Sequence, residues 1–320
     1  MTYRILVTDK VALSGLGPLV DDESFEVVSI DDSASEEFRV ALGTADALIV
    51  RSATLVTRDM LALAPRLKAV GRAGVGVDNV DIPAATERGV AVFNAPGGNT
   101  IAAAELTIGL LIAIARRITA AEASLRRGEW DRAAFKGVEL RGKTIGLIGA
   151  GRIGSEVAFR CHAFGMRVHA CDPYLSLARA EELAVDMVDL ETVIEHADFI
   201  SIHVPLTDET RGIFDAGSLR RMKPTAYLIN VSRGGVVDEA ALAKALHNGD
   251  IAGAALDVYE SEPLSSDSPL RDAPNLVLTP HLGASTTEAQ IGVATEVAEK
   301  IRILLRTGSF TDALNASDLG

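Results

Sequence analysis

A glycine-rich run at residues 143–154 constrains the fold of this chain more than any other feature. Its letters are KTIGLIGAGRIG, in which an apolar stretch leads into Gly149, Gly151 and Gly154 and an apolar-periodic stretch follows. A strand that enters such a turn and a helix that leaves it form the first half of a dinucleotide-binding βαβ unit. Asp172 ends the next apolar run, close to the roughly 20-residue spacing at which a carboxylate binds the adenosine ribose. The run therefore predicts a bound dinucleotide.

The same motif indicates which dinucleotide binds. Its glycines permit in turn a tight turn, a close approach to the pyrophosphate, and close packing of helix on strand, while the helix N-terminus attracts the anion. The carboxylate of Asp172 repels a 2′-phosphate, and the residues after it, Pro173 and Tyr174, carry no positive charge. We therefore expect NAD rather than NADP. The alternative, a glycine-rich turn that binds nothing, is disfavoured because strand, helix and Asp172 are all in place.

Composition excludes several classes of protein. The chain has 320 residues, of which 48% are hydrophobic and 23% charged, so it can bury the cores of two globular domains. Its net charge of −13 and its lack of Lys and Arg clusters argue against binding to nucleic acid. Its only cysteines, Cys161 and Cys171, show neither C-x-x-C spacing nor an extracellular disulfide pattern. No Asp, Glu, Cys or His spacing of metal-ligand type accompanies the histidines, so we expect no metal site.

The sequence also indicates where the protein resides. It begins directly as a strand with no apolar signal core, and its most apolar stretch, residues 101–118, is interrupted by charged residues. That interruption leaves it short of the ~20 residues of a membrane span. We therefore expect a cytoplasmic protein with no membrane segment.

Short apolar runs alternate with helical patterns on both sides of the glycine motif, which is typical of α/β domains built on parallel sheets. The first series lies at 4–7, 25–30, 47–50, 69–71 and 90–93. The second lies at 143–148, 167–172, 198–204, 226–231, 252–258 and 275–279. We expect two doubly wound parallel-sheet domains: a flavodoxin-like substrate domain (1–99 plus 287–320) and a Rossmann NAD-binding domain (100–286).

Two predicted helices connect the two domains. One is predicted over residues 100–127 and is apolar almost all round as far as Ile118, so several sides need cover. A second copy of the chain is a natural source of that cover, which predicts a homodimer; burial within one chain is the alternative. The other helix, about 286–305, follows the second sheet and is expected to return to the first domain.

Three polar residues follow predicted strands of the second domain. Arg233 follows the run 226–231, Glu262 follows the run 252–258, and His281 follows the run 275–279. In open α/β sheets, sites form outside the carboxyl ends of the strands. A guanidinium can hold a 2-oxo or 2-hydroxy carboxylate, and an imidazole can give or take the hydroxyl proton. A carboxylate beside the imidazole favours its protonated form. Each residue alone has an ordinary structural explanation, but their joint placement predicts a catalytic set.

At this point the sequence resembles the D-isomer-specific 2-hydroxyacid dehydrogenases, and within that family most resembles the branch that oxidises phosphoglycerate. The resemblance covers about residues 3–316. It rests on the segments RAGVGVDNVD (72–81), NAPGGNT (94–100), AELT (104–107), GAGRIG (149–154), SRGGVVDE (232–239), AALDV (254–258) and PHLGAS (280–285).

The resemblance implies roles for individual residues. Arg233 would bind the substrate carboxylate and carbonyl, His281 would be the acid/base, and Glu262 would partner the histidine. The cofactor would be held by residues from the glycine turn onward: Gly149, Gly151, Arg152, Ile153, Gly154, Asp172, His203, Val204, Val231, Ser232, Asp257 and Gly283. The substrate would face a loop and an adjacent strand end: Arg51, Ser52, Arg72, Ala73 and Gly74.

Some positions depart from this pattern or have a second interpretation. Relatives place Thr or Ser where this chain has Val75 and Val204, so a side-chain hydroxyl contact to the cofactor is lost. His203 also ends a strand, and packing is the alternative to its role in the cofactor pocket. Arg132 or Lys136 could reach a neighbouring subunit's substrate, or could be ordinary surface charges.

The resemblance implies NAD-dependent oxidation of 3-phospho-D-glycerate to 3-phosphohydroxypyruvate, the first step of serine biosynthesis, or the reverse reaction. One alternative is a reductase of glyoxylate, hydroxypyruvate or another D-2-hydroxyacid, and a less favoured one is an NAD-sensing module without catalysis. The physiological acid, the direction in the cell, and the choice between dimer and tetramer stay open. Because the chain stops at Gly320 without the regulatory domains that relatives carry, we expect little inhibition by L-serine.

Overall fold

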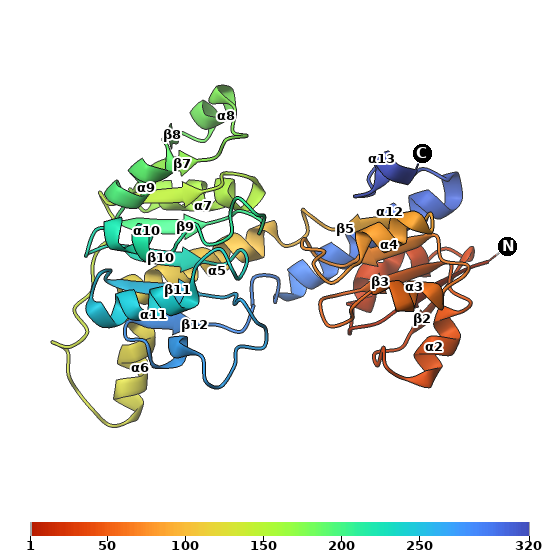
Figure 1. Cartoon of the computed structure of the whole chain (residues 1–320), viewed down its shortest axis with the longest axis horizontal. Coiled ribbons are helices and arrows are strands. Elements are labelled where there is room, and N and C mark those ends of the chain that lie inside the picture. Colours follow the sequence, from red (N-terminus) through yellow and green to blue (C-terminus); the bar gives the residue numbers. More distant parts are fainter. Residues whose placement is uncertain (1, 320) are drawn as a thin grey trace. The chain divides into compact units, whose positions relative to one another are not determined.

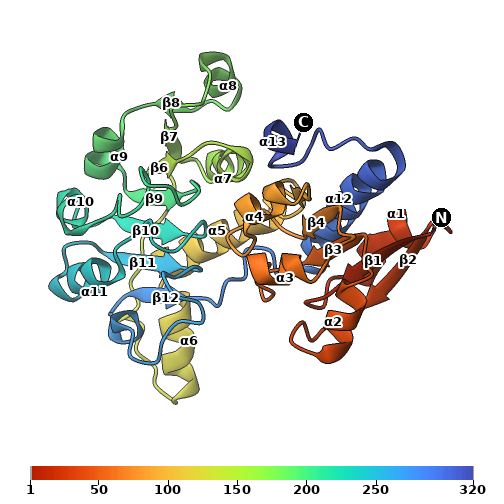
Figure 2. The same cartoon turned by 45° about the vertical axis from the view of Figure 1, so that its right-hand side comes forward.

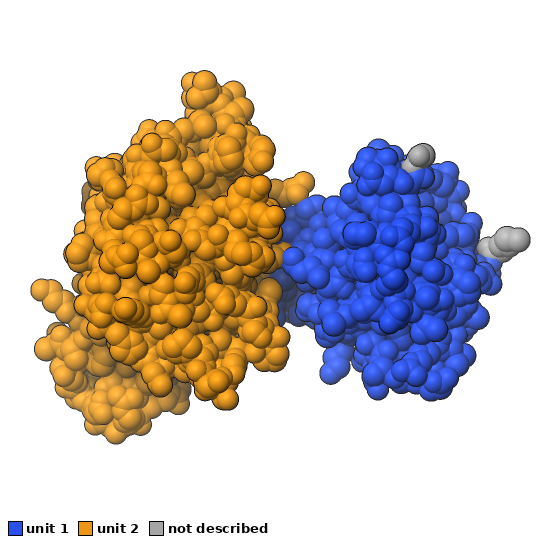
Figure 3. Space-filling model, in the orientation of Figure 1, with its two compact units in different colours: residues 1–100, 284–320 blue, residues 101–283 orange. Residues whose placement is uncertain are grey.

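The structure is a computed structural model that describes residues 2–319 (Figure 1). It divides into two compact units (Figure 3), and each unit has its own sheet. Unit 1 comprises Met1–Thr100 and Ala284–Gly320, and unit 2 comprises Ile101–Gly283.

Unit 1 is built on a five-stranded sheet in which every pair of neighbouring strands is parallel. Its strands, in the order β2-β1-β3-β4-β5, are β1 (Tyr3–Val7), β2 (Phe25–Ser29), β3 (Ala47–Val50), β4 (Ala69–Arg72) and β5 (Ala91–Asn94). Its helices are η1 (Leu13–Leu16), α1 (Gly17–Val20), α2 (Glu36–Leu42), α3 (Arg58–Ala62), α4 (Ile82–Glu87), α12 (Thr287–Thr307) and α13 (Ala316–Leu319). The order 2-1-3-4-5 is that of flavodoxin-like folds, as the sequence predicted.

Helices cover both faces of this sheet, which explains why its strands are continuous apolar runs. All four residues of β3 are buried, and separate apolar clusters lie on the two faces. The long helix α12 packs on one face. A Cβ atom at Gly71 would lie only 2.2 Å from Cγ1 of Val297, so the missing side chain lets α12 pack closely against β4.

Unit 2 is built on a seven-stranded parallel sheet. Its strands, in the order β12-β11-β10-β9-β6-β7-β8, are β6 (Thr144–Ile148), β7 (Arg167–Cys171), β8 (Asp186–Met187), β9 (Phe199–Ile202), β10 (Tyr227–Asn230), β11 (Gly253–Leu256) and β12 (Leu276–Leu278). Its helices are α5 (Thr100–Ala115, whose first residue belongs to unit 1), α6 (Ile118–Arg126), α7 (Arg152–Ala163), α8 (Leu177–Glu182), α9 (Leu190–His196), α10 (Ala216–Arg221), α11 (Glu239–Asn248) and η2 (Pro269–Asp272). The strand order reverses between β6 and β9, where a Rossmann fold binds its ligand.

The helices of unit 2 form a layer on each face of its sheet. Helices α5 and α7 contribute to one apolar cluster, whereas α9, α10 and α11 contribute to the other, and Figure 2 shows the latter three along one side. Two parallel-sheet α/β units were predicted, and the structure confirms them. The short strand β8 was not predicted, because both of its residues are exposed and give no apolar signal.

The prediction of one continuous helix over 100–127 is wrong, because the chain breaks at Arg117, whose φ of 54° is left-handed. The guanidinium of Arg117 donates to Oδ1 of Asn275 at 2.7 Å. The N–H of Val138 donates to the carbonyl of Ala115 at 2.9 Å, which satisfies one open end of α5. These contacts come from residues distant in sequence, so the local apolar pattern could not reveal them. Among residues 2–319, no helix is long and apolar enough to cross a bilayer.

The packing of α12 on β4 predicts opposite effects of two glycine-to-alanine changes in unit 1. Gly71→Ala should lower the free energy of unfolding by about 1–3 kcal/mol, because its methyl group would overlap Val297. Gly43→Ala should raise the free energy of unfolding by about 0.4–1 kcal/mol. The nearest atom to a Cβ at Gly43 is the carbonyl oxygen of Val40 at 3.6 Å, and the backbone there is right-handed helical. Urea unfolding of both variants measures the difference. Equal stabilities would contradict the close packing.

Candidate active site

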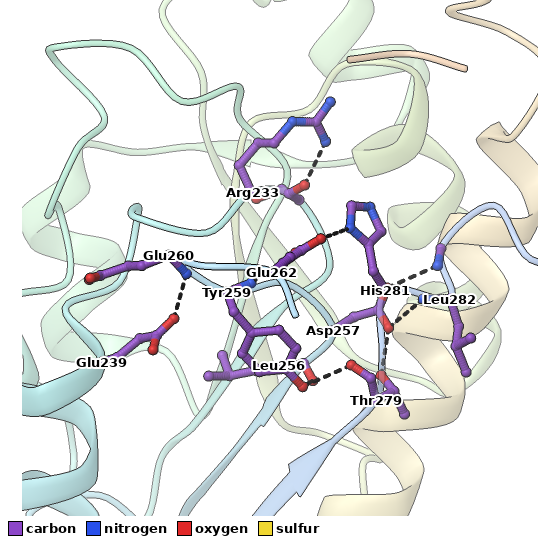
Figure 4. A network of polar contacts seen from close by, with 12 residues as sticks. Arg233, Glu239, Leu256, Asp257, Tyr259, Glu260, Glu262, Thr279, His281 and Leu282 are labelled. Atoms are coloured by element: carbon purple, nitrogen blue, oxygen red, sulfur yellow. Dashed lines mark hydrogen bonds and ion pairs between the residues drawn. The ribbon is translucent and has the colours of Figure 1, made fainter. Parts of the chain in front are cut away.

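The three residues predicted to be catalytic all lie in unit 2, beyond the carboxyl ends of three adjacent strands. Arg233 follows β10, Glu262 follows β11 and His281 follows β12. Because these strands are parallel neighbours, residues almost 50 positions apart along the chain come to one edge of the sheet (Figure 4). The sheet therefore brings the set together.

Glu262 and His281 form a direct pair. Nδ1 of His281 lies 2.6 Å from Oε2 of Glu262, and Oε1 of Glu262 accepts the N–H of Tyr259 at 3.1 Å. Partial burial raises the pKa of Glu262, but the hydrogen bond and the charge of His281 more than offset this and hold it below its usual value. Glu262 is therefore a carboxylate at neutral pH, and the imidazole beside it is oriented by that contact.

The backbone of His281 is held in an unusual conformation. Its φ is 52°, and its N–H donates to the carbonyls of Asp257 at 2.9 Å and Thr279 at 3.1 Å. The buried carboxylate of Asp257 accepts from the hydroxyl of Thr279 at 2.6 Å and from the N–H groups of Leu282 at 2.7 Å and Gly283 at 2.9 Å. Burial raises the pKa of Asp257 despite these bonds. Asp257 thus fixes the turn that presents His281.

The loop that carries Arg233 is organised by a buried asparagine. Oδ1 of Asn230 accepts the N–H and the hydroxyl of Ser232, at 2.9 and 2.8 Å, and its amide donates to the carbonyl of Arg233 at 2.8 Å. The half-buried guanidinium of Arg233 contacts the carbonyl of Ser232 at 2.7 Å. Asn230 was not among the residues predicted from the sequence, although its place as a polar residue at the end of an apolar strand was the available signal.

The glycine motif has the geometry that a pyrophosphate site needs. Gly149 has a φ of 91°, and a Cβ there would lie 2.9 Å from the carbonyl oxygen of His203. A Cβ at Gly154 would lie 2.3 Å from the carbonyl oxygen of Gly149. Gly151 caps α7 without a side-chain hydrogen bond and has open space where its Cβ would be. The first N–H groups of this 12-residue helix are therefore available to an anion, which fits a dinucleotide.

Asp172 lies beside this turn, directly after β7. Its Oδ2 accepts the N–H of Ala150 at 2.8 Å and its Oδ1 accepts that of Tyr174 at 2.9 Å. The carboxylate is thereby tied to the glycine loop, and each oxygen keeps a lone pair for a ribose hydroxyl. These residues fit NAD, which would supply hydride acceptance and donation when bound.

His203 lies below the glycine turn, at the end of β9. Its Nε2 is 2.9 Å from the hydroxyl oxygen of the buried Ser201, and enclosure by protein atoms lowers its pKa to about 4. A histidine that stays neutral throughout the physiological range, with its backbone against Gly149, fits the cofactor pocket or its packing rather than a second acid/base.

The other predicted cofactor residues lie at the same edge of the unit 2 sheet. Arg152 and Ile153 open α7, Val204 follows β9, and Val231 and Ser232 follow β10. Arg132 and Lys136 are exposed in the segment after α6. These are the two basic residues proposed to reach the substrate of a neighbouring subunit.

The predicted substrate residues belong to unit 1. Arg51 and Ser52 follow β3, Arg72 ends β4, and Ala73 and Gly74 come next. The N–H of Arg51 donates to Oδ2 of Asp9 at 2.8 Å. A Cβ at Gly74 would lie 1.5 Å from Nη1 of Arg72, so the guanidinium rests against the glycine backbone. These residues share the carboxyl edge of the unit 1 sheet.

Within residues 2–319, no group of three or more His, Cys, Asp or Glu side chains is arranged to hold a metal ion. The two cysteines are unpaired thiols, and burial raises the pKa of Cys161 to about 12.

Comparison with known proteins places the chain in a family. Residues 108–283 match the model of the NAD-binding domain of the D-isomer specific 2-hydroxyacid dehydrogenases. The chain is 50% identical over 299 residues to a D-3-phosphoglycerate dehydrogenase of Bacillus subtilis, covering 93% of this chain and 56% of that protein. The chain thus spans just over half the length of the curated relatives it matches.

Solved structures agree with this result. The TT0316 protein of Thermus thermophilus is 35% identical with a TM-score of 0.86, covering 98% of this chain and all of that one. An NAD-dependent formate dehydrogenase of Staphylococcus aureus, solved with NAD, is 30% identical with a TM-score of 0.83, covering 97% of each chain. This chain belongs to the D-isomer-specific 2-hydroxyacid dehydrogenase family and carries its NAD-binding domain.

The position of Asp172 predicts how cofactor preference can be changed. Asp172→Ser combined with Tyr174→Arg should move preference from NAD toward NADP, because the ribose acceptor is lost and a cation for the 2′-phosphate is gained. Titration with both reduced cofactors, followed by nicotinamide fluorescence, measures the ratio of dissociation constants. Equal affinity of the unmodified chain for NADPH and NADH would contradict the role of Asp172.

Proposed function

We propose that this chain catalyses the NAD-dependent oxidation of 3-phospho-D-glycerate to 3-phosphohydroxypyruvate, and the reverse reaction. The main support is the Glu262–His281 pair, which lies beside Arg233 at the carboxyl edge of an NAD-binding sheet. The substrate class follows from relatives named D-3-phosphoglycerate dehydrogenase, of which several are about 50% identical over most of this chain. In this proposal unit 2 holds NAD and unit 1 is the substrate domain.

Arg233 would bind and polarise the substrate. A guanidinium presents paired donors that match a carboxylate, and a further N–H can polarise the adjacent carbonyl or hydroxyl oxygen. The Asn230 bonds hold the Arg233 backbone in place, so the guanidinium is presented from a fixed loop. Asp257 and Gly283 would lie along the nicotinamide half of the cofactor.

His281 would carry the proton. In oxidation, neutral imidazole takes the C2 hydroxyl proton, and in reduction, imidazolium returns it to the carbonyl oxygen. Since Nδ1 faces Glu262, the other ring nitrogen is the one that would meet the substrate. The ionised Glu262 stabilises the imidazolium that oxidation generates.

The phosphate of the substrate needs a cation of its own. It lies several Å beyond the carboxylate that Arg233 would take, and unit 1 offers Arg51 and Arg72 at the carboxyl edge of its sheet. We propose these two residues as phosphate ligands, with Arg132 or Lys136 of a second copy as the alternative source of charge.

A homodimer, which could pair further into a tetramer, forms part of this proposal. Several large apolar side chains of α6 and the segment after it lie open: Ile118 is 49% exposed, Leu125 57% and Trp130 80%. Large exposed apolar side chains in one segment support an interaction surface, which a second copy would cover. A reduced, cytoplasmic setting is also proposed, with the two unpaired thiols in its support.

The phosphate proposal predicts a change in substrate selectivity. Arg51→Ala should lower kcat/KM for 3-phospho-D-glycerate by about 10–100-fold, because a hydrogen bond to a charged group contributes about that much. The kcat/KM for D-glycerate, which has no phosphate, should change little. Initial rates of NADH formation measure both. Arg58→Ala, which removes an exposed arginine of the same unit, is the matched control and should leave both unchanged. Reduction of glyoxylate as efficient as that of phosphohydroxypyruvate would overturn the proposal in favour of a general reductase.

The Glu262–His281 pair predicts a pH signature. The rate of oxidation should increase as pH rises, and the rate of reduction should increase as pH falls. The pKa of Glu262 is depressed, so its charge is present at neutral pH and is lost only as pH falls well into the acid range. Glu262→Gln removes this charge and should move both limbs of the pH–rate profile to lower pH. A pH–rate profile identical to that of the native chain would remove Glu262 from this role.

The exposed side chains of Ile118 and Leu125 predict a change in assembly. Ile118→Glu with Leu125→Glu should convert the homodimer to monomer, because burying two carboxylates in an interface is costly. Sedimentation velocity measures the mass. Val40→Glu, at a side chain that is 66% exposed in unit 1, is the control and should stay dimeric. A native chain that sediments as a monomer would contradict the proposed homodimer.

A further inference from the structure

The loop that carries Glu262 is fastened by a second carboxylate. Glu239, the first residue of α11, accepts the N–H of Glu260 on its Oε1 at 2.6 Å (Figure 4). Glu262 itself accepts the N–H of Tyr259 at 3.1 Å. Two carboxylates thus hold consecutive N–H groups of one short loop, one from within the loop and one from a helix more than 20 residues earlier.

The peptide that joins Tyr259 to Glu260 also packs against the loop that carries Arg233. A Cβ atom at Gly234 would lie 1.8 Å from the carbonyl oxygen of Tyr259 and 2.6 Å from the nitrogen of Glu260. Only a glycine permits that approach. Gly234 lies between Arg233 and Glu239 in the chain. One segment, residues 233–239, therefore contacts the peptide at 259–260 twice, through Gly234 and through Glu239.

The ring of Tyr259 anchors the loop on its other side. Its hydroxyl donates to the carbonyl of Thr279 at 2.8 Å and lies 3.2 Å from that of Leu256. Thr279 precedes His281 by two residues and also bonds Asp257. The loop that carries Glu262 is therefore fixed toward β12 by Tyr259 and toward α11 by Glu239.

Capping of α11 does not account for Glu239. That role belongs to Asp238, whose Oδ1 accepts the N–H of Ala241 at 2.8 Å. Partial burial raises the pKa of Glu239, the N–H of Glu260 lowers it, and the carboxylates of Glu260, Asp238 and Glu262 raise it again. Glu239 is thus a carboxylate in surroundings that disfavour its charge, and its hydrogen bond to the loop is the one with the N–H of Glu260. We take that bond to be the function of this side chain.

We propose that Glu239 is a positioning residue that holds Glu262 against His281 through the peptide N–H of Glu260. The inference deepens the proposed function, on which its kinetic part rests. Without the acceptor at Glu239, the loop would lose one of its two backbone anchors and Glu262 would sample positions beyond hydrogen-bond reach of the imidazole. The geometry of an acid/base pair tolerates little such freedom.

Four variants of the full chain separate the bond from the charge. Glu239→Ala removes the acceptor and one charge. Glu239→Gln keeps an acceptor oxygen and removes the charge. Glu239→Asp keeps the charge but is shorter by one methylene, and it serves if the alanine variant fails to fold. Glu260→Ala is the matched control, since it removes a carboxylate from the same loop and keeps the N–H.

The first readout is the pH titration of the His281 ring by NMR, assigned by its loss in His281→Gln, which needs neither substrate nor turnover. Glu239→Ala and Glu239→Asp should move the titration of His281 to lower pH, in the same direction as Glu262→Gln. Glu239→Gln and Glu260→Ala should leave it near the native position. In the Glu262→Gln background, Glu239→Ala should add no further shift, because its effect passes through Glu262.

The second readout is kinetic. Glu239→Ala should lower kcat about tenfold with KM changed less than about twofold, and Glu239→Gln should restore kcat. Equal effects of Glu239→Ala and Glu239→Gln on the His281 titration would assign the effect to charge and overturn the proposal. A native titration in Glu239→Ala and Glu239→Asp would overturn it as well. A native chain that does not turn over phosphoglycerate would instead refute the proposed function, while the titration still decides the role of Glu239.

Discussion

The contact between Nδ1 of His281 and Oε2 of Glu262, at 2.6 Å, is the interaction on which the site depends. It joins residues from two loops, and each loop needs its own support. On one side, the buried Asp257 holds the left-handed turn at His281 with its carbonyl and both carboxylate oxygens. On the other, the N–H of Tyr259 holds Glu262. A residue with φ of 52° is sustained only when its surroundings over-determine it, and these bonds do so.

Parallel-sheet topology explains why these loops meet. Strands β10, β11 and β12 are neighbours, so their carboxyl ends deliver Arg233, Glu262 and His281 to one edge. The order reversal between β6 and β9 places the glycine turn on the same edge. The proposed catalytic groups and the glycine turn thus share an edge because every strand of unit 2 runs in one direction. The helices on both faces bury the strands and leave this edge to the loops.

Features encoded by local pattern could be predicted from the sequence, whereas those that depend on distant contacts could not. The turn at Gly149 and its partner Asp172 are local, and both parallel sheets follow from alternating apolar runs. Strand ends also indicate Arg233 and His281 as candidates. The break at Arg117 depends on Asn275, which is 158 residues away. The four hydrogen bonds that Asp257 accepts and the contact of Gly234 with Tyr259 likewise depend on loops that only the fold brings together.

The most direct measurement follows the hydrogen on C2 of the substrate. The purified chain is given NAD and 3-phospho-D-glycerate deuterated at C2, and the reduced cofactor is analysed by mass spectrometry. We expect the deuterium on the nicotinamide ring, 3-phosphohydroxypyruvate in equal amount, and neither product from His281→Ala. Unlabelled cofactor, or undiminished turnover by His281→Ala, would contradict the assignment of the Glu262–His281 pair as the acid/base of this reaction.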